Sequence, residues 1–249
     1  MLSVLNCSVS PYLPQNKRST WVEFEKLLQS KARLSLRYKK YSSPSAFTKA
    51  CSNGQLGLIY ADPYHASILL RNYGYMPVVR ALGQYDEAVV VVRADSTLLD
   101  IQDLNPKMYL SISVEPVNRL LGRVLLQPAN INEDDMVCRY HRTHRSVVRD
   151  LCLDKTDVGV IAARNFDRLP SKIKKQLRIL VRTQAYLFSS VWMLSPNHTD
   201  QYSALARVFK RMHKNRKGSS LLKKFNTKSW LHVEQIKAEE MADLLNMLR

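Results

Sequence analysis

The residues best suited to bind an anion are four consecutive polar ones, Thr143, His144, Arg145 and Ser146. The sequence places them where a helix begins, because an amphipathic helix over 145–153 and an apolar strand over 158–162 follow. Backbone N–H groups at a helix start lack partners within the helix, and the helix dipole makes that end positive. Side-chain donors would point at the same spot, so we expect this turn to contact an anion. The alternative is a solvated cap built with Ser146.

Two further turns have the same place, directly after a predicted strand. Asp62, Tyr64 and His65 follow the strand expected over 56–60, and Asn118 and Arg119 follow the strand expected over 108–114. Ligands of open α/β sheets bind outside the carboxyl ends of the strands, which favours these positions for a site. The alternatives are plain capping by Asp62 with Tyr64 in the core, and an exposed first helical turn at Asn118 and Arg119.

Tyr12 follows the first predicted strand, over 2–9. Like Asn118 and Arg119, it is interpreted either as a ligand contact or as an exposed residue. Tyr186 and Trp192 interrupt an apolar segment, and we interpret them as hinge or core aromatics rather than as residues that stack on a ligand.

Motifs for catalysis and metal binding are missing from the sequence. It contains no GxSxG, HExxH, Walker or Rossmann fingerprint and no metal-ligand spacing, so we predict no catalytic residue, metal or cofactor. The four cysteines form no CxxC pair, which favours buried free thiols over a disulfide. His65 or His144 beside a carboxylate would suit acid-base catalysis, so an enzyme remains the open alternative.

Strands and helices alternate along most of the chain, which indicates an α/β protein with 249 residues available for a substantial core. The most apolar strand is expected over 85–93, where the run AVVVV implies burial on both faces at the centre of a sheet. An aromatic strand over 185–194 is expected to cross between two lobes. From 200 onward the pattern predicts helices.

The net charge of +17 would attract nucleic acid, anionic membrane surfaces or small anions without choosing among them. The basic segment over 210–218 is the strongest signal for nucleic acid, but no recognition helix, zinc spacing or aromatic platform accompanies it. We therefore interpret it as a solvated helix face and regard nucleic-acid binding as unlikely.

The amino terminus has no basic segment ahead of an apolar one, and no run of about 18 apolar residues occurs, so no transmembrane segment is expected. A periplasmic location is expected if a signal was removed from this chain, and a cytoplasmic one otherwise.

Four segments together carry a resemblance to a known family: SPSAFTKACSNGQLGLIYADPYHASILL, GQYDEAVVVVRADSTLLDIQDL, THRSVVRDLCLDKTDVGVI and LRILVRTQAYLFSSVWMLSP. Over about residues 1–200 the chain resembles the phosphate/phosphite/phosphonate-type solute-binding proteins of ABC transporters. The resemblance implies that Tyr64 or His65 and His144 face a ligand. Where that family has a Ser-Thr-Ser turn, this chain has Asn118-Arg119-Leu120, which replaces two hydroxyl donors by a guanidinium.

The resemblance implies a two-lobe, type 2 periplasmic-binding-protein-like α/β fold, with mixed sheets flanked by helices and a ligand cleft between the lobes. We expect one discontinuous lobe over 1–94 and 183–249 and a second over 95–182. The implied function is reversible binding of a phosphonate, a phosphate-like oxyanion or an organic anion, as a transporter receptor or a sensor. The expected partners are this ligand and an ABC-transporter permease or a signalling protein. The alternative is a cytoplasmic enzyme of the same fold, of the menaquinone- or thiamin-precursor type.

Overall fold

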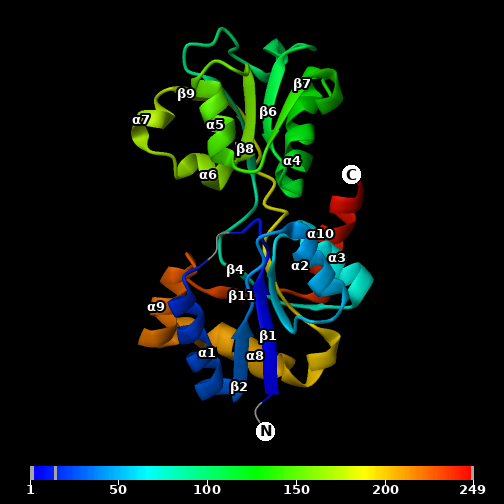
Figure 1. The fold of residues 1–249 in the computed structure, drawn as a ribbon, viewed down its shortest axis with the longest axis vertical. Coiled ribbons are helices and arrows are strands. Elements are labelled where there is room, and N and C mark those ends of the chain that lie inside the picture. The colour runs from blue at the N-terminus through cyan, green and yellow to red at the C-terminus, as the bar shows by residue number, and fades with distance from the viewer. Residues whose placement is uncertain (1–2, 14–15, 248–249) are drawn as a thin grey trace. The chain divides into compact units, whose positions relative to one another are not determined.

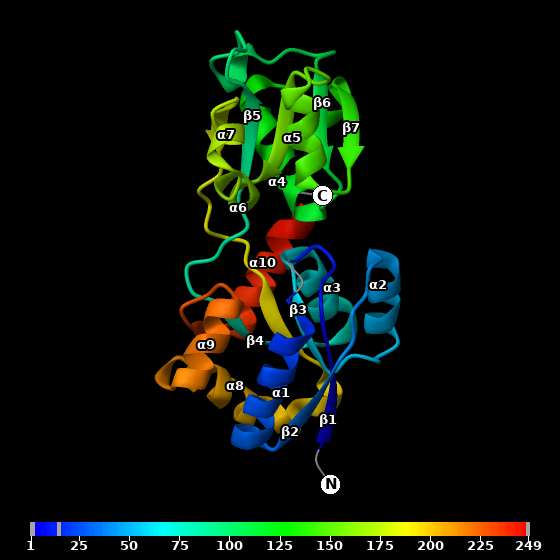
Figure 2. The same ribbon diagram turned by 60° about the vertical axis from the view of Figure 1, so that its left-hand side comes forward.

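The computed structural model describes residues 3–13 and 16–247 and divides the chain into two compact units. Unit 1 contains residues 1–84 and 189–248, and unit 2 is the continuous segment 85–188. Figures 1 and 2 show that each unit is built around one sheet with helices packed against it, as the sequence predicted. In the described part of the chain, no helix combines the length and the apolar character that a bilayer crossing requires.

Unit 1 has a six-stranded mixed sheet in the order β11-β4-β10-β3-β1-β2. Its elements are β1 Ser3–Val9, α1 Arg18–Ala32, β2 Leu34–Tyr38, α2 Pro44–Ser52, β3 Leu58–Ala61, α3 Pro63–Tyr73, β4 Met76–Ala81, β10 Val191–Leu194, α8 Tyr202–Arg211, α9 Arg216–Lys224, β11 Trp230–His232 and α10 Gln235–Met247. Strand β1 runs parallel to β2 and β3, whereas β10 runs antiparallel to both of its neighbours. Helices α1, α8 and α9 lie on one face of this sheet, and α2, α3 and α10 lie on the other.

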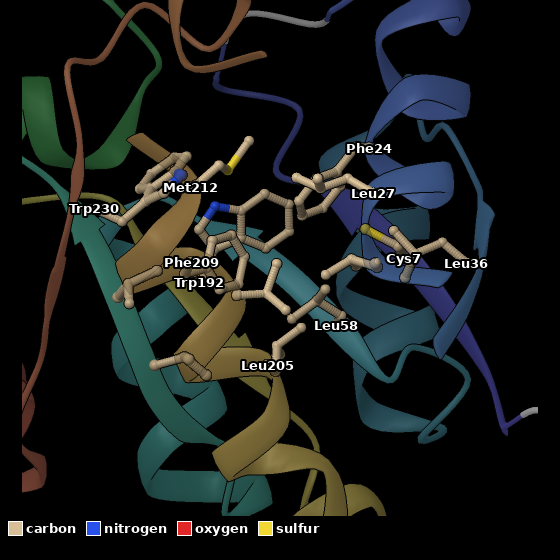
Figure 3. Close-up of a cluster of buried hydrophobic side chains, with 14 of the residues drawn as sticks. Cys7, Phe24, Leu27, Leu36, Leu58, Trp192, Leu205, Phe209, Met212 and Trp230 are labelled. Atoms are coloured by element: carbon tan, nitrogen blue, oxygen red, sulfur yellow. The ribbon is translucent and has the colours of Figure 1, made fainter. Parts of the chain in front are cut away.

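The core of unit 1 is centred on Trp192, whose side chain is fully buried (Figure 3). Its ring centroid lies 5.7 Å from that of Phe24 on α1, 5.5 Å from that of Phe209 on α8, and 5.0 Å from that of Tyr60 on β3. Such tilted and stacked aromatic pairs add directional contacts to the burial of apolar area. Trp192 is therefore a core residue, one of the two roles that the sequence favoured for it.

Unit 2 has a five-stranded sheet in the order β7-β6-β8-β5-β9. Its elements are β5 Ala88–Arg93, β6 Tyr109–Ser113, α4 Pro116–Leu126, β7 Val137–His141, α5 His144–Cys152, β8 Val158–Ala162, α6 Ala163–Asp167, α7 Ser171–Lys174 and β9 Leu177–Arg182, with short 3-10 turns at 101–103, 127–129 and 133–135. Helices α4 and α5 approach β8 closely from opposite faces. A Cβ on Gly159 would lie 2.6 Å from Leu151 of α5, and a Cβ on Gly122 of α4 would lie 2.9 Å from Val160.

The apolar strand expected over 85–93 is β5, and its four valines are completely buried between β8 and β9, as predicted. The pairing of β5 with β8 and β9 also places the unit boundaries at other residues than the sequence predicted. Residues 88–93 belong to the sheet of unit 2, so the chain leaves unit 1 after Gln84 rather than near residue 94. It returns at Ser189, not at residue 183, because Arg182 still pairs with Val89 and the backbone N–H of Asp86 donates to the carbonyl of Phe188.

The aromatic strand expected over 185–194 is only half present. Strand β10 begins at Val191, and Tyr186 has a positive φ of 53° that no strand residue adopts. The side chain of Tyr186 is 59% exposed and packs edge-on against Tyr85, with ring centroids 5.3 Å apart.

Candidate functional site

One edge of the unit 2 sheet collects the ends of four strands. Strands β6, β7 and β8 are parallel, so their carboxyl ends meet at this edge, and α4, α5 and α6 begin from it. Strand β5 is antiparallel to β8, and Ala88 pairs with Ala162. The residues just before β5 therefore lie at the same edge as the residues just after β8.

Four ionisable side chains from these strand ends, His144, Glu115, Arg164 and Asp86, are linked in one row. Nε2 of His144 lies 2.9 Å from Oε2 of Glu115, and Nη2 of Arg164 donates to Oε1 of Glu115 at 3.0 Å. Nη1 of Arg164 donates in turn to Asp86. Glu115 and Asp86 are each only 8% exposed, so both carboxylates are largely shielded from water. Shielding strengthens each contact, so the row is a rigid set of donors and acceptors rather than a loose surface cluster.

Thr143, His144 and Arg145 divide among three roles. The Thr143 hydroxyl caps α5 by accepting from the backbone N–H of Ser146 at 3.2 Å, which is the capping arrangement predicted as the alternative for this turn. His144 belongs to the row through its contact with Glu115. Arg145 is exposed and forms no ion pair within the described residues.

Asn118 and Arg119 have partners away from this row. Asn118 is 3% exposed, and its Nδ2 donates to the carbonyl of Val160 at 3.2 Å. Arg119 donates to the buried carboxylate of Glu133 at 2.8 Å, and its guanidinium lies 4.9 Å from the ring centroid of Tyr140. A ligand contact by Asn118 or Arg119 stays a prediction. The amide nitrogen of Asn118 and the guanidinium of Arg119 have partners within unit 2, whereas the buried Oδ1 of Asn118 has no hydrogen-bond partner among the described residues.

In unit 1, Asp62 is the centre of a buried hydrogen-bond network. Its Oδ1 accepts from the backbone N–H groups of Tyr64 at 3.0 Å and His65 at 3.2 Å, which caps α3. Its Oδ2 lies 2.5 Å from Nδ1 of His65 and accepts from the Ser10 hydroxyl at 2.5 Å. Asp62 and His65 are only 2% and 3% exposed.

Burial and the partners of Asp62 shift its pKa in opposite directions. Burial alone would raise the pKa of Asp62, but the charge of His65 and the hydrogen bonds from His65 and Ser10 outweigh it and lower that pKa. The far side of the His65 ring is also enclosed: Nε2 lies 3.4 Å from the Thr48 hydroxyl, and the ring meets that of Phe47 edge-on. His65 therefore has a partner at each ring nitrogen.

Tyr12 and Tyr64 are the half-buried members of this group, with ring centroids 5.7 Å and 5.4 Å from that of His65. The predicted Tyr12, Asp62, Tyr64 and His65 thus lie together, at the carboxyl ends of the parallel strands β1 and β3. Among these four, the tyrosines are the residues that reach the surface. The ligand cleft predicted between the lobes stays a prediction.

Sequence reasoning missed Arg164 and Asp86 and treated Glu115 only as a helix opener. Arg164 stands two residues after β8, in the same strand-to-helix position as His144, and this position is the signal in the sequence that points to it. Asp86 precedes its strand, and only the antiparallel direction of β5 brings it to this edge. In the described residues, no group of three or more His, Cys, Asp or Glu side chains is placed to hold a metal ion.

Comparison with curated protein sequences gives no match. Many solved structures are similar in fold, among them the following three. XAC2383 from Xanthomonas citri bound to ATP has a TM-score of 0.80 at 16% identity, covering 99% of this chain and 98% of its own. PhnD1 from Prochlorococcus marinus in complex with methylphosphonate has a TM-score of 0.76 at 16% identity, covering 99% of both chains. The periplasmic aliphatic sulphonate binding protein SsuA from Escherichia coli has a TM-score of 0.66 at 12% identity, covering 98% of this chain and 92% of its own.

These likenesses confirm the two-lobe, periplasmic-binding-protein-like fold that the sequence motifs predicted. The model of the family described as "ABC transporter, phosphonate, periplasmic substrate-binding protein" matches residues 8–237. That match confirms the resemblance, and it implies a small anionic ligand and a transporter permease as partners. The chain belongs to the family of periplasmic substrate-binding proteins of phosphonate ABC transporters.

Proposed function

We propose that this protein reversibly binds a small oxyanion, of the phosphonate, phosphate or organic-acid type, through His144 and Arg164 at the edge of the unit 2 sheet. The observation that carries the proposal is the position of Glu115. Its carboxylate lies 2.9 Å from His144 and 3.0 Å from Arg164, so the two side chains already hold a bound oxyanion, one that the chain itself supplies. A ligand oxyanion would take the place of that carboxylate.

The exchange favours a ligand with more charge than Glu115. A carboxylate offers two oxygens and one charge, whereas a phosphonate or phosphate offers three or more oxygens and up to two charges. Both groups accept charge-assisted hydrogen bonds, but the Coulomb attraction to the Arg164 guanidinium grows with the charge of the ligand, so the doubly charged group gains more. Glu115 would thereby act as an internal competitor that weakens the binding of singly charged anions.

In unit 1, the residues predicted from the sequence to contact a ligand stay part of this proposal. Tyr12 and Tyr64 present aromatic rings and hydroxyls beside the fixed Asp62–His65 pair. The family supports the ligand class, since PhnD1 is described in complex with methylphosphonate and SsuA as a sulphonate-binding protein. Ligand binding would then be signalled to an ABC-transporter permease, or to a signalling partner if the chain acts as a sensor.

The test is a thermal-shift screen with methylphosphonate, inorganic phosphate, sulfate and succinate, followed by calorimetric titration of the best ligand. We expect Arg164→Gln to weaken binding by roughly 10- to 100-fold, the worth of one hydrogen bond to a charged group. Glu115→Gln should tighten the binding of singly charged anions, because the internal competitor is neutralised.

Arg123→Gln is the matched control, since it removes the same charge from an arginine of the same unit that pairs with Glu133. It should leave ligand affinity unchanged. The proposal fails if no anion raises the melting temperature, or if Arg123→Gln weakens binding as much as Arg164→Gln does. Conversion of the ligand, followed by phosphorus or proton NMR, would support the enzyme alternative instead.

A further inference from the structure

The positive charge of this protein is concentrated in unit 1. Residues 1–84 and 189–248 carry 21 Lys and Arg against 8 Asp and Glu, a net charge of +13, whereas residues 85–188 carry 16 against 13. Within unit 1, residues 201–233 contain nine Lys and Arg and no Asp or Glu. The proposed ligand row lies in unit 2, so this excess of charge is unexplained by binding a small anion there.

A groove between α1 and α9 lies beside this basic segment. Its volume is about 580 Å³. The groove is lined by Glu23, Lys26, Leu27 and Ser30 from α1 and by Arg216, Lys217, Ser220 and Leu221 from α9. Figures 1 and 2 show the two helices next to each other on one face of the unit 1 sheet.

Three cations of the groove have no internal counter-charge. Lys26, Arg216 and Lys217 form no side-chain ion pair or hydrogen bond within residues 3–13 and 16–247. The one acidic lining residue, Glu23, is paired with Lys224 at 2.5 Å. The groove therefore presents a positive potential above a floor that includes the buried Leu27 and Leu221.

We propose that this face of unit 1 docks on an anionic phospholipid surface, with a lipid phosphate held by Lys26, Arg216 and Lys217. The charge complementarity is direct, because each Lys or Arg near an anionic membrane contributes to attraction over about one Debye length. The groove is larger than a single phosphate needs, and Leu27 and Leu221 suit the glycerol part of a lipid headgroup. None of the lining residues is aromatic, so the groove has no platform on which a nucleic-acid base would stack.

The experiment is co-sedimentation of the full chain with vesicles of phosphatidylcholine alone and of phosphatidylcholine mixed with phosphatidylglycerol, at low and high salt. The groove variant is Lys26→Gln, Arg216→Gln, Lys217→Gln. The matched control is Arg168→Gln, Lys172→Gln, Lys175→Gln, which removes the same charge from exposed positions of unit 2. All six side chains are exposed or at the surface of their helix, and circular dichroism melting checks that both variants fold.

We expect wild type to bind only the anionic vesicles at low salt, and the groove variant to bind roughly 100-fold more weakly, while the control stays within a few-fold of wild type. Equal losses in both variants would mean that net charge, not this face, drives binding, and would overturn the proposal. So would no binding by wild type, or retention on DNA or RNA at a salt concentration that releases the vesicles.

Two further readouts separate this surface from other anion sites. If inorganic phosphate raises the melting temperature of wild type but not of the groove variant, the groove is a site for a soluble anion and the membrane assignment is wrong. The groove variant should keep the thermal shift with the unit 2 ligand unchanged. Failure of the proposed ligand site and failure of the membrane face are therefore seen in different assays.

Discussion

The buried carboxylate of Asp62 gives the most direct test of the network that positions the unit 1 residues. Asp62→Ala removes the cap of α3 and leaves Ser10 and His65 without their acceptor. Loss of the cap costs about 1 kcal/mol, and an orphaned buried polar group costs about 1–3 kcal/mol. Ser10 Oγ and His65 Nδ1 are already 3.4 Å apart and can partner each other, so the second cost is counted once. The expected loss of unfolding free energy is about 2–4 kcal/mol.

Urea unfolding followed by tryptophan fluorescence measures this loss of stability in unit 1, which contains Asp62. All three tryptophans, Trp21, Trp192 and Trp230, are buried in unit 1, so the signal reports the unfolding of that unit. Ser43→Ala is the matched control, because Ser43 caps α2 of the same unit through one backbone N–H at a partly exposed position. It should cost no more than about 1 kcal/mol.

The acid range tests the charge on the same residue. A lowered pKa means that the contribution of Asp62 to stability is present above the ordinary aspartate pKa of about 4 and is lost as the pH falls through the lower, folded-state value. Asp62→Asn should lack this part of the acid loss. The reasoning is refuted if Asp62→Ala is no more destabilising than Ser43→Ala, or if Asp62→Asn loses stability in acid as steeply as wild type.

Two other expectations concern packing and thiol chemistry. Gly218→Ala should destabilise unit 1 by roughly 2 kcal/mol or more, since the added Cβ would overlap the carbonyl oxygen of Met212. Urea unfolding of this variant, with Ser219→Ala as the control, measures the loss of stability. Equal unfolding midpoints for the two variants would contradict this expectation. Burial raises the pKa of the Cys7 thiol and raises that of Cys51 to about 12, so neither should react with a disulfide reagent at pH 8 until urea unfolds the protein. Rapid reaction of all the cysteines in the native protein would contradict this.

Local pattern predicted the elements best where burial is complete. Strand β8 was expected over 158–162 and has those bounds. Its five consecutive apolar residues favour a strand that is buried on both faces of the sheet, and all five are buried. Thr143 was placed where α5 begins because an amphipathic helix and an apolar strand follow it, and in the structure its side chain caps that helix. In both cases the information lies within a few residues of the element itself.

Long-range pairing accounts for what the sequence did not predict. The sequence favoured an unpaired guanidinium at Arg119. In the structure, Arg119 forms an ion pair with Glu133, which lies fourteen residues later in the chain. The unit boundaries were misplaced because only the pairing of β5 with β8 and β9 assigns it to unit 2. Tyr186 belongs to an aromatic run that favours a strand, yet its φ of 53° ends that run before β10 begins.

The insertion of unit 2 into unit 1 has a consequence for the order in which the chain becomes structured during synthesis. Strand β10 lies between β3 and β4, so the unit 1 sheet cannot close, and Trp192 cannot fill its core, until residues 191–194 have been made. Residues 85–188 are contiguous and complete by then. The unit that begins second is therefore the first whose whole sequence is available, and the earlier half of unit 1 lacks its central strand until residues 191–194 have been made.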